Sequence, residues 1–389
     1  MPFSRRARRL AESATVRCAR RALELRAAGH DLVDLTAGEP DFRSPDVALD
    51  AARRALDAGL TKYTPAAGLP DLRSAVADSY RRRFDAPWRT GDALITVGAK
   101  AALFQIFQVW IDDGDEVVIP YPAWVSFEEQ VRLAGGRPVT VPMSSEDGFA
   151  IRARPLIDAM TEKTRAVVVN SPCNPTGGLI DAAELRQIAD ACAGRDALLV
   201  CDETYERFLY DGARHASGAA LAAEHPGHIL VISSFSKTWA MTGWRVGFAV
   251  GPGPIIAKMA QLQGHMTSNP TTFAMHGAVA ALANGEADVT AMLAAFTRRR
   301  ELAVEALGAI PGVACAPPSG AFYAFPRLEA ADRVGSLALA EALLDRGVAV
   351  IPGAAFGADG HLRLSFACAE ETLLEGIDRL RRALPHIGG

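Results

Sequence analysis

Apolar residues gather in short runs between about residues 90 and 250, and segments with helical spacing of apolar residues separate these runs. Two of the runs, residues 167–169 and 198–200, contain no polar position, which is typical of strands covered by helices on both faces. This alternation predicts an α/β fold with a mostly parallel mixed sheet sandwiched by helices. The predicted strands cover residues 94–97, 116–120, 139–142, 166–170, 198–202, 229–233 and 246–250, and residues 182–192 form the clearest intervening helix.

The two ends of the chain show a different pattern. Residues 1–30 and about 286–389 favour helices, most clearly at 297–307 and 336–346, with short strands at 321–325, 348–351 and 362–365. We therefore predict a smaller α+β domain built from both chain ends. The expected division is 1–46 for an N-terminal arm and part of the small domain, 47–285 for the large domain, and 286–389 for the small C-terminal domain.

Composition narrows the class of protein. The formal net charge of −4 gives no basic excess that would favour nucleic acid or an anionic membrane. The arginines between positions 5 and 9 suggest either a short basic arm or a solvated helix face. The six cysteines are scattered without CxxC spacing, so we expect neither a metal site nor a redox dithiol. Without a secretory signal or an apolar run of ~20 residues, a cytoplasmic globular protein is expected.

Candidate chemistry begins with Lys237, which follows the predicted strand 229–233. Hydroxyl and aromatic residues flank this lysine, and desolvation there would favour its neutral, nucleophilic form. Arg245 could bind a phosphate group, and Ser234 and Ser236 could donate to the same oxygens. A surface lysine is the alternative interpretation when Lys237 is taken alone.

Three further polar residues follow neighbouring strands. Asp202 ends the strand 198–202, where a carboxylate either caps a helix or pairs with a buried cation such as a protonated pyridine nitrogen. Tyr205 can point the same way. Asn174 stands between two prolines in a sharp loop, so its amide either faces a ligand or caps its own turn.

A strand-to-helix junction supplies the remaining candidates. Small residues around Ala99 and Lys100 leave backbone N–H groups free at a helix N-terminus, which can bind an anion. Trp124 follows another strand and either stacks on a flat ring or belongs to the core. All these residues follow strands of one predicted sheet, where ligands of parallel sheets bind, and together they supply the parts of a pyridoxal-phosphate (PLP) site.

At these positions the chain resembles the class I/II PLP-dependent aminotransferases of fold type I, particularly the bacterial aspartate-aminotransferase-like branch. The likeness runs nearly from end to end. It rests on AGEPDF (37–42), KYTPAAG (62–68), NPTG (174–177), DETY (202–205), SKTWAMTGWRVG (236–247), SGAFY (319–323) and RLS (363–365).

The resemblance implies pyridoxal 5'-phosphate as cofactor and a role for each matching residue. Lys237 would form the Schiff base and carry the catalytic proton, Asp202 would pair with the ring nitrogen, and Tyr205 and Asn174 would bind the phenolic oxygen. Trp124 would stack on the ring beside the substrate. The residues implied to hold the phosphate are Ala99, Lys100, Ser234, Ser236, Arg245 and, from a second subunit, Tyr63.

The resemblance also implies the reaction. Arg363 would clamp the substrate α-carboxylate, assisted by Asn174 and the backbone of Gly38. An amino group would pass between an L-amino acid and a 2-oxo acid by a ping-pong mechanism. Because Tyr63 acts across an interface in such enzymes, a homodimer is expected. No nucleic-acid or membrane partner is implied.

Departures from the family pattern bear on the substrate. Cys173 replaces a common Asn, and Ala11, followed by Glu12, stands where members that accept dicarboxylic acids often have Lys. His265 and Met266 occupy a segment, expected to be a loop, that usually carries small polar residues. We therefore predict a preference for aromatic or apolar amino acids, with glutamate/2-oxoglutarate as the other pair.

Three alternatives remain from the sequence alone. They are aspartate aminotransferase activity, a PLP-dependent C–S β-lyase, and a catalytically silent PLP-like scaffold. Retention of Lys237, Asp202 and Arg363 together argues against the silent scaffold, which needs none of them.

Overall fold

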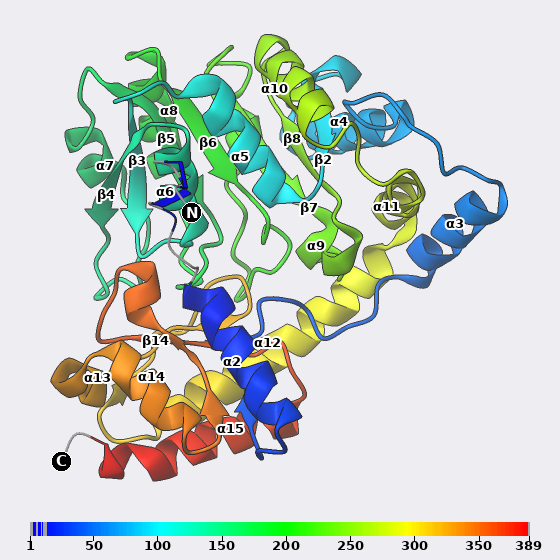
Figure 1. Cartoon of the computed structure of the whole chain (residues 1–389). Coiled ribbons are helices and arrows are strands. Elements are labelled where there is room, and N and C mark those ends of the chain that lie inside the picture. Colours follow the sequence, from blue (N-terminus) through cyan, green and yellow to red (C-terminus); the bar gives the residue numbers. More distant parts are fainter. Residues whose placement is uncertain (1–2, 5–6, 9, 11–13, 388–389) are drawn as a thin grey trace.

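A sheet of seven strands forms the centre of the fold (Figure 1). The computed structural model describes residues 3–4, 7–8, 10 and 14–387. The strand order is β2-β8-β7-β6-β5-β3-β4. The strands are β2 (Ala93–Thr96), β3 (Glu116–Tyr121), β4 (Arg137–Pro142), β5 (Thr164–Asn170), β6 (Leu198–Asp202), β7 (Ile229–Ser234) and β8 (Gly247–Val250).

The predicted strands are confirmed with ends that shift by no more than a few residues. Strands β4, β3, β5, β6 and β7 are parallel neighbours, whereas β8 runs antiparallel to both β7 and β2. The sheet is therefore mostly parallel and mixed, as expected. The polar residues that follow β3, β5, β6 and β7 consequently meet at one edge of the sheet.

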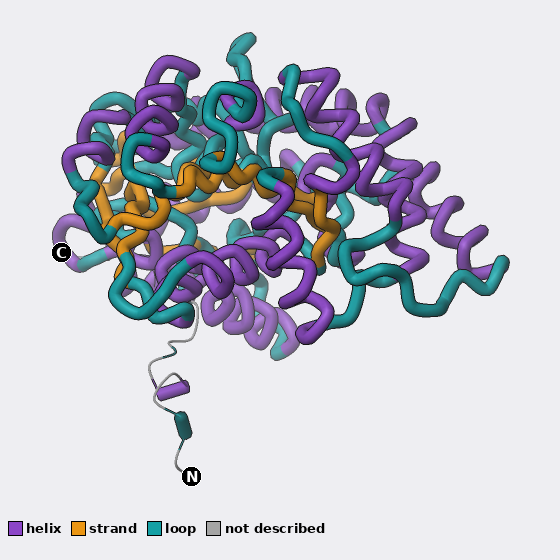
Figure 2. The backbone as a smooth tube through the Cα atoms, turned by 90° about the horizontal axis from the view of Figure 1, so that it is seen from above, coloured by secondary structure: helices purple, strands orange, loops and turns teal. Residues whose placement is uncertain are grey.

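Helices cover both faces of this sheet, and Figure 2 shows the strands as a band with helices on either side. Val168 and Val200 pack with side chains of α5, α6 and α10, whereas Val167 and Leu199 belong to the core shared with α4, α8 and α11. Burial on both faces explains the unbroken apolar runs. The helices of this part are α3 (Asp46–Asp57), α4 (Pro70–Phe84), α5 (Ala99–Trp110), α6 (Ser126–Leu133), α7 (Ala153–Asp158), α8 (Ala182–Ala193), α9 (Phe235–Thr238), α10 (Gly253–Met266) and α11 (Thr272–Asn284).

The N-terminal segment joins the C-terminal part of the chain through strand pairing. β1 (Val33–Asp34) pairs with β12 (Val348–Ala349), and β14 (Leu362–Ser365) lies between β10 (Tyr323–Ala324) and β13 (Ile351–Pro352). A further pair joins β9 (Val313–Ala314) to β11 (Arg327–Leu328). The helices here are α2 (Ala14–Ala27), α12 (Glu286–Gly308), α13 (Glu329–Val334), α14 (Ser336–Leu344) and α15 (Glu370–Ala383). The exact domain boundaries stay a prediction.

Two sequence predictions are corrected here. The strand expected at 348–351 is two strands, β12 and β13, which pair with different partners, β1 and β14. The helix expected at 297–307 begins eleven residues earlier, at Glu286, and runs as the long α12 (yellow in Figure 1). Within the described residues, none of the individual helices has the length and hydrophobicity to cross a bilayer, and the pair α11 and α12, bent by 76°, meets that test when taken together.

Candidate active site

The strand ends of the large sheet open into a cavity of about 390 Å³. Every sequence-predicted site residue except Tyr63 lines it. The lining residues are Thr36, Gly38, Ala99, Lys100, Trp124, Asn170, Asn174, Asp202, Thr204, Tyr205, Ser234, Ser236, Lys237, Arg245, Tyr323 and Arg363. The strand register explains why these residues meet in one cavity, since Asn170 at the end of β5 pairs with Asp202 at the end of β6.

Asp202 is a buried carboxylate at the end of β6. Its Oδ1 accepts a hydrogen bond of 3.1 Å from the backbone N–H of Thr204, and its carbonyl accepts one of 3.1 Å from Nδ2 of Asn170. Burial raises the pKa of Asp202 to about 6, because a charged carboxylate is poorly solvated there. No helix follows Asp202 directly, so the helix-cap interpretation is wrong. A cationic partner in the cavity would relieve this desolvation.

Lys237 projects into the cavity from α9, the short helix after β7. Its Nζ donates to the carbonyl of Gly38, 199 positions away in the chain. Burial lowers the pKa of Lys237 to about 8, so about a tenth of the amine is neutral at pH 7, far more than for an ordinary lysine. The surface-lysine interpretation is therefore wrong, because tertiary packing brings the Gly38 segment over the amine.

An anion-binding corner forms where α5 begins. Ala99 and Lys100 are its first two residues, whose N–H groups have no partner inside a helix. A Cβ on Gly98 (φ 78°) would lie 2.5 Å from the Arg245 guanidinium, and one on Gly247 would lie 2.5 Å from the Ala99 nitrogen. These glycines let Arg245 approach the helix N-terminus closely. The corner thus joins a helix dipole, free N–H groups and a guanidinium, a donor set that suits a phosphate.

Arg363 lies on the side of the cavity formed by β14 and is 4% exposed. It donates to Oδ1 of Asn174 (3.0 Å) and to the carbonyl of Thr36 (2.9 Å). Its Nε is buried without a hydrogen-bond partner among the described residues. A guanidinium has five N–H donors, so this arrangement leaves donors for a carboxylate.

The two tyrosines of the cavity contact each other. The hydroxyls of Tyr205 and Tyr323 are 2.9 Å apart, and the Arg363 guanidinium lies 4.3 Å from the centroid of the Tyr323 ring. Burial raises the pKa of both tyrosines above the usual range, so both remain protonated.

These features fit PLP. The cavity places a carboxylate (Asp202) and an anion-binding corner at Arg245 around the amine of Lys237, whose pKa is lowered. A pyridinium ring, a phosphate arm and an aldehyde require these three partners. The Nε of Arg363, which no described residue binds, adds a place for a substrate carboxylate.

Some sequence-selected residues lie elsewhere. Tyr63 is 87% exposed and does not line this chain's cavity. His265 and Met266 form the last turn of α10, so the prediction that they lie in a loop is wrong; the helix runs two residues past Gly264 before it ends. Both are exposed and lie outside the cavity of their own chain. Ala11 and Glu12 lie outside the described residues.

Sequence reasoning missed several cavity residues, namely Thr36, Asn170, Thr204, Tyr323 and the side chain of Lys100. Tyr323 stands inside the SGAFY motif, so a motif signal was present but no role followed from it. The Lys100 ammonium lies 4.8 Å from the centroid of the Trp124 ring, and burial lowers its pKa. Cys173 is buried beside Asn174, with Sγ 3.6 Å from the carbonyl of Pro122.

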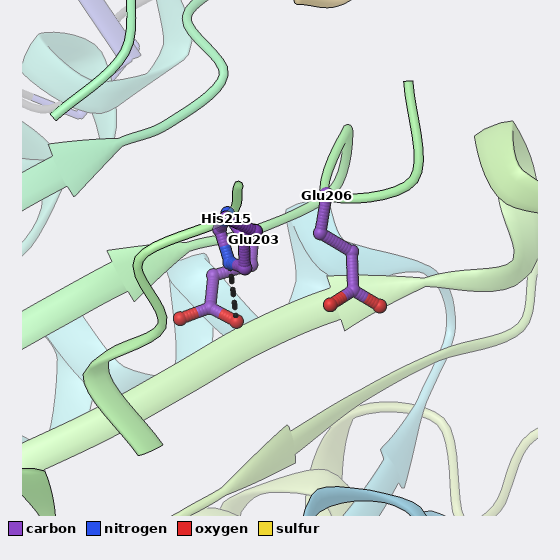
Figure 3. Close-up of side chains that lie close together, drawn as sticks. All are labelled: Glu203, Glu206 and His215. Carbon is purple, nitrogen blue, oxygen red and sulfur yellow. Dashed lines mark ion pairs between the residues drawn. The ribbon is translucent and has the colours of Figure 1, made fainter. Parts of the chain in front are cut away.

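A second group of titratable residues lies just beyond Asp202 in the sequence. Glu203, Glu206 and His215 come together as potential metal ligands among the described residues (Figure 3). Glu206 pairs in bidentate fashion with Arg83 (2.9 and 2.7 Å), and Glu203 accepts from Ser217 (2.8 Å). Nε2 of His215 lies 3.1 Å from Glu203. Because protein donors already bind both carboxylates, we interpret the cluster as a buried ion-pair network.

Comparison with known proteins agrees with this geometry. Residues 30–380 match the family described as aminotransferase class I and II. The chain is 43% identical over 383 residues to a probable aspartate/prephenate aminotransferase of Aquifex aeolicus, covering 97% of each chain. It is 43% identical over 387 residues to the aspartate aminotransferase of Geobacillus stearothermophilus, covering 98% of each.

A solved structure shares the fold as well. The aspartate aminotransferase of Thermus thermophilus, solved with maleate, superimposes with a TM-score of 0.94 at 43% identity, covering 98% of this chain and 100% of that one. The fold and site therefore define a PLP-dependent transferase of amino-acid metabolism. The chain belongs to the class I and II aminotransferases, which use PLP.

Proposed function

We propose that the chain moves an amino group between an L-amino acid and a 2-oxo acid in two half-reactions at this one cavity, a ping-pong mechanism. One observation carries the proposal. The amine of Lys237 shares the cavity with the buried carboxylate of Asp202 and with Arg363, whose Nε has no hydrogen-bond partner among the residues that the structure describes. These are a proton carrier, a partner for a ring nitrogen and a receptor for a carboxylate.

PLP, when bound, supplies a ring that withdraws electrons from the Cα of an attached amino acid. Asp202 would hold the ring nitrogen protonated. Its pKa of about 6 leaves it largely ionised at neutral pH, and a nearby cation would favour the ionised form further. Ala99, Lys100, Ser234, Ser236 and Arg245 would anchor the phosphate, and Trp124 would cover the ring.

The reactive proton is assigned to Lys237. With a pKa of about 8, its Nζ can accept the proton from the substrate Cα and return it in the same half-reaction. Tyr205 and Asn174 would donate to the phenolic oxygen of the cofactor. Arg363 would bind the substrate α-carboxylate, and its bond to Asn174 orients the guanidinium before the substrate arrives.

A homodimer completes the proposed site. Tyr63 lies on the segment between α3 and α4, where its exposed ring has no role within its own chain's cavity. That segment is held in place, because Thr272 donates to the carbonyl of Lys62 (2.8 Å) and Gln263 donates to that of Ala66 (2.5 Å). We propose that Tyr63 reaches the phosphate of the partner subunit.

Among the described residues that line the cavity, one cationic side chain has no role in the proposed mechanism and is available to select the substrate. Lys237, Arg245 and Arg363 have roles, whereas the side chain of Lys100 remains beside Trp124. A second carboxylate on a substrate would meet this ammonium, which supports a dicarboxylic pair such as glutamate and 2-oxoglutarate. The names of the relatives, aspartate and aspartate/prephenate aminotransferase, also support a dicarboxylic substrate, although the amino acid that they name is aspartate.

For the other substrate pair we retain the prediction of an aromatic or apolar amino acid. Met266 is 40% exposed and stands three residues after Gln263, which binds the Tyr63 segment. If Tyr63 enters the partner's cavity, Met266 lies close to that cavity as well and adds an apolar side chain to its wall. Aspartate would then be a weaker donor than glutamate.

Visible absorption of the PLP-loaded protein tests these proposals. Single amino acids, added without any 2-oxo acid, should convert the aldehyde form of the cofactor to its amine form. Glutamate and phenylalanine should convert it faster than aspartate, and Lys100→Met should slow glutamate by roughly 10- to 100-fold while sparing phenylalanine. Lys258→Met, on the exposed side of α10, is the matched control. Release of pyruvate and ammonia from cysteine conjugates without an acceptor would instead indicate a β-lyase.

A further inference from the structure

Tyr323 is buried between two parts of the site that the proposed mechanism uses separately. It belongs to β10 and pairs with Ser365 of β14, the strand that carries Arg363. Tyr323 is 0% exposed to solvent, and it forms part of the wall of the cavity.

The ring of Tyr323 supports Arg363, the proposed receptor for the substrate carboxylate. The Arg363 guanidinium lies 4.3 Å from the centroid of the Tyr323 ring and 5.2 Å from that of Phe356. A cation near an aromatic face is stabilised by the ring's electron density, and a buried guanidinium gains most because little water competes. With Asn174 and Thr36 binding its terminal nitrogens, the guanidinium is held at several points before a substrate arrives.

The hydroxyl of Tyr323 contacts Tyr205, the residue proposed to bind the phenolic oxygen of the cofactor. It lies 2.9 Å from the hydroxyl of Tyr205, and each group has one hydrogen to donate. If Tyr205 donates its hydrogen to the phenolic oxygen of the cofactor, the hydrogen between the two tyrosines must come from Tyr323. A hydroxyl that accepts one hydrogen bond becomes a stronger donor in the next.

We infer that Tyr323 is a positioning residue that aligns both the oxygen-binding hydroxyl of Tyr205 and the carboxylate-binding guanidinium of Arg363. The inference rests on the proposed function, because it takes Tyr205 and Arg363 to bind cofactor and substrate. It assigns separate tasks to the two parts of one side chain: the hydroxyl to the cofactor and the ring to the substrate.

Two substitutions separate these tasks in the PLP-loaded enzyme. Tyr323→Phe keeps the ring and removes the hydroxyl, whereas Tyr323→Leu removes both. Tyr210→Phe is the matched control, because the Tyr210 hydroxyl is also buried but donates to the carbonyl of Ala321 and does not line the cavity.

The first readout is the pH titration of the absorption spectrum of the bound cofactor. Loss of the Tyr323 hydroxyl weakens donation to the phenolic oxygen, so the pKa of this spectral titration should rise by roughly half a unit in Tyr323→Phe. Tyr205→Phe should raise it at least as much, and adding Tyr323→Phe to Tyr205→Phe should change nothing further. Tyr210→Phe should titrate like the wild type.

The second readout is the dissociation constant of maleate, measured by the change in the same spectrum. Tyr323→Phe should bind maleate within about twofold of the wild type, and Tyr323→Leu should bind it roughly 5- to 20-fold more weakly. Equal titration curves for wild type and Tyr323→Phe, or equal maleate affinity in Tyr323→Leu, would overturn the inference. A wild type that amino acids do not convert would instead overturn the proposed function, so the two failures are distinguishable.

Discussion

Asn174 accepts a hydrogen bond of 3.0 Å from the Arg363 guanidinium, although 189 positions separate the two residues. Asn174 follows β5 in the large sheet, whereas Arg363 belongs to β14 near the C-terminus. The backbone N–H of Asn174 in turn donates to Oδ1 of Asn170 (2.9 Å), which fixes the loop at the sheet edge. The bond therefore connects the proposed cofactor-binding sheet to the proposed substrate receptor.

Asn174→Ala should weaken substrate binding without unfolding the chain. Arg363 loses a charge-assisted partner, so kcat/KM for every amino acid donor should fall by roughly 10- to 100-fold. Steady-state kinetics with glutamate and phenylalanine would check this. Equal losses for both donors are expected because the α-carboxylate is common to them, and a loss confined to glutamate would contradict the assignment.

Gly98→Ala should weaken PLP binding by roughly 10- to 100-fold, because the new Cβ would displace Arg245 from the anion corner. Gly114→Ala provides the control. Gly114 also has a positive φ, of 90°, but a Cβ there would meet nothing within 4 Å. Equilibrium titration of each apoprotein with PLP separates backbone strain, which both variants share, from loss of the corner.

Lys237→Met should stabilise the apoprotein at pH 7 by about 1–2 kcal/mol, because it removes an amine that is buried in its charged form. The folded-state pKa of Lys237, about 8, lies below its ordinary 10.5, so the unfolded chain binds more protons between these values. Wild-type stability from this group therefore rises from pH 8 to 10.5, and the variant should lack this rise.

Urea unfolding at pH 7 and pH 10 measures both effects. Lys258→Met is the control, because that ammonium is exposed on α10. If both variants show the pH dependence of the wild type, the lowered pKa of Lys237 is refuted.

His215 should make stability depend on pH in the direction opposite to Lys237, and His215→Gln should remove this dependence. Burial alone disfavours the protonated ring, but the adjacent Glu203 outweighs it and raises the pKa of His215 above 6.5. The native state then binds more protons than the unfolded state just above pH 6.5, and stability from this pair is lost as pH rises through the folded-state pKa. The wild type should therefore be less stable at pH 9 than at pH 6 through this group. Urea midpoints at these two pH values should show the loss in the wild type and not in His215→Gln.

Mixing one variant that lacks the catalytic amine with one that lacks the Tyr63 hydroxyl tests the exchange of Tyr63 between subunits. In a mixed dimer of Lys237→Ala and Tyr63→Phe chains, one site combines an intact Lys237 with an intact Tyr63 from the other chain. Random mixing should restore about a quarter of the wild-type activity, since half of the dimers are mixed and each has one intact site. Sedimentation velocity establishes the dimer independently. Dimers without recovered activity would show that Tyr63 serves its own chain or neither.

The strands and most cavity residues could be predicted from local sequence. Residues 167–169 and 198–200 lack polar positions because helices cover both faces of the sheet. Asp202 ends the strand of the second run, and Asn174 stands in the loop after the strand of the first. The direction of β8 could not be predicted in this way, since an apolar run reads the same in a parallel and an antiparallel strand. The last turn of α10 could not be predicted as a helix, because its polar and small residues, such as Gly264, hide the helical pattern.

The sequence by itself determined which residue types follow each buried strand, because burial on two faces demands apolar runs and polar residues must stand outside them. It therefore identified Lys237, Asp202 and Arg245 as candidates. Only the tertiary structure decided that Arg363 and Tyr323, from the C-terminal part of the chain, contact Asn174 and Tyr205 in one cavity. Such contacts depend on how separate strands pack in space, and neither periodicity nor spacing along the chain records that packing.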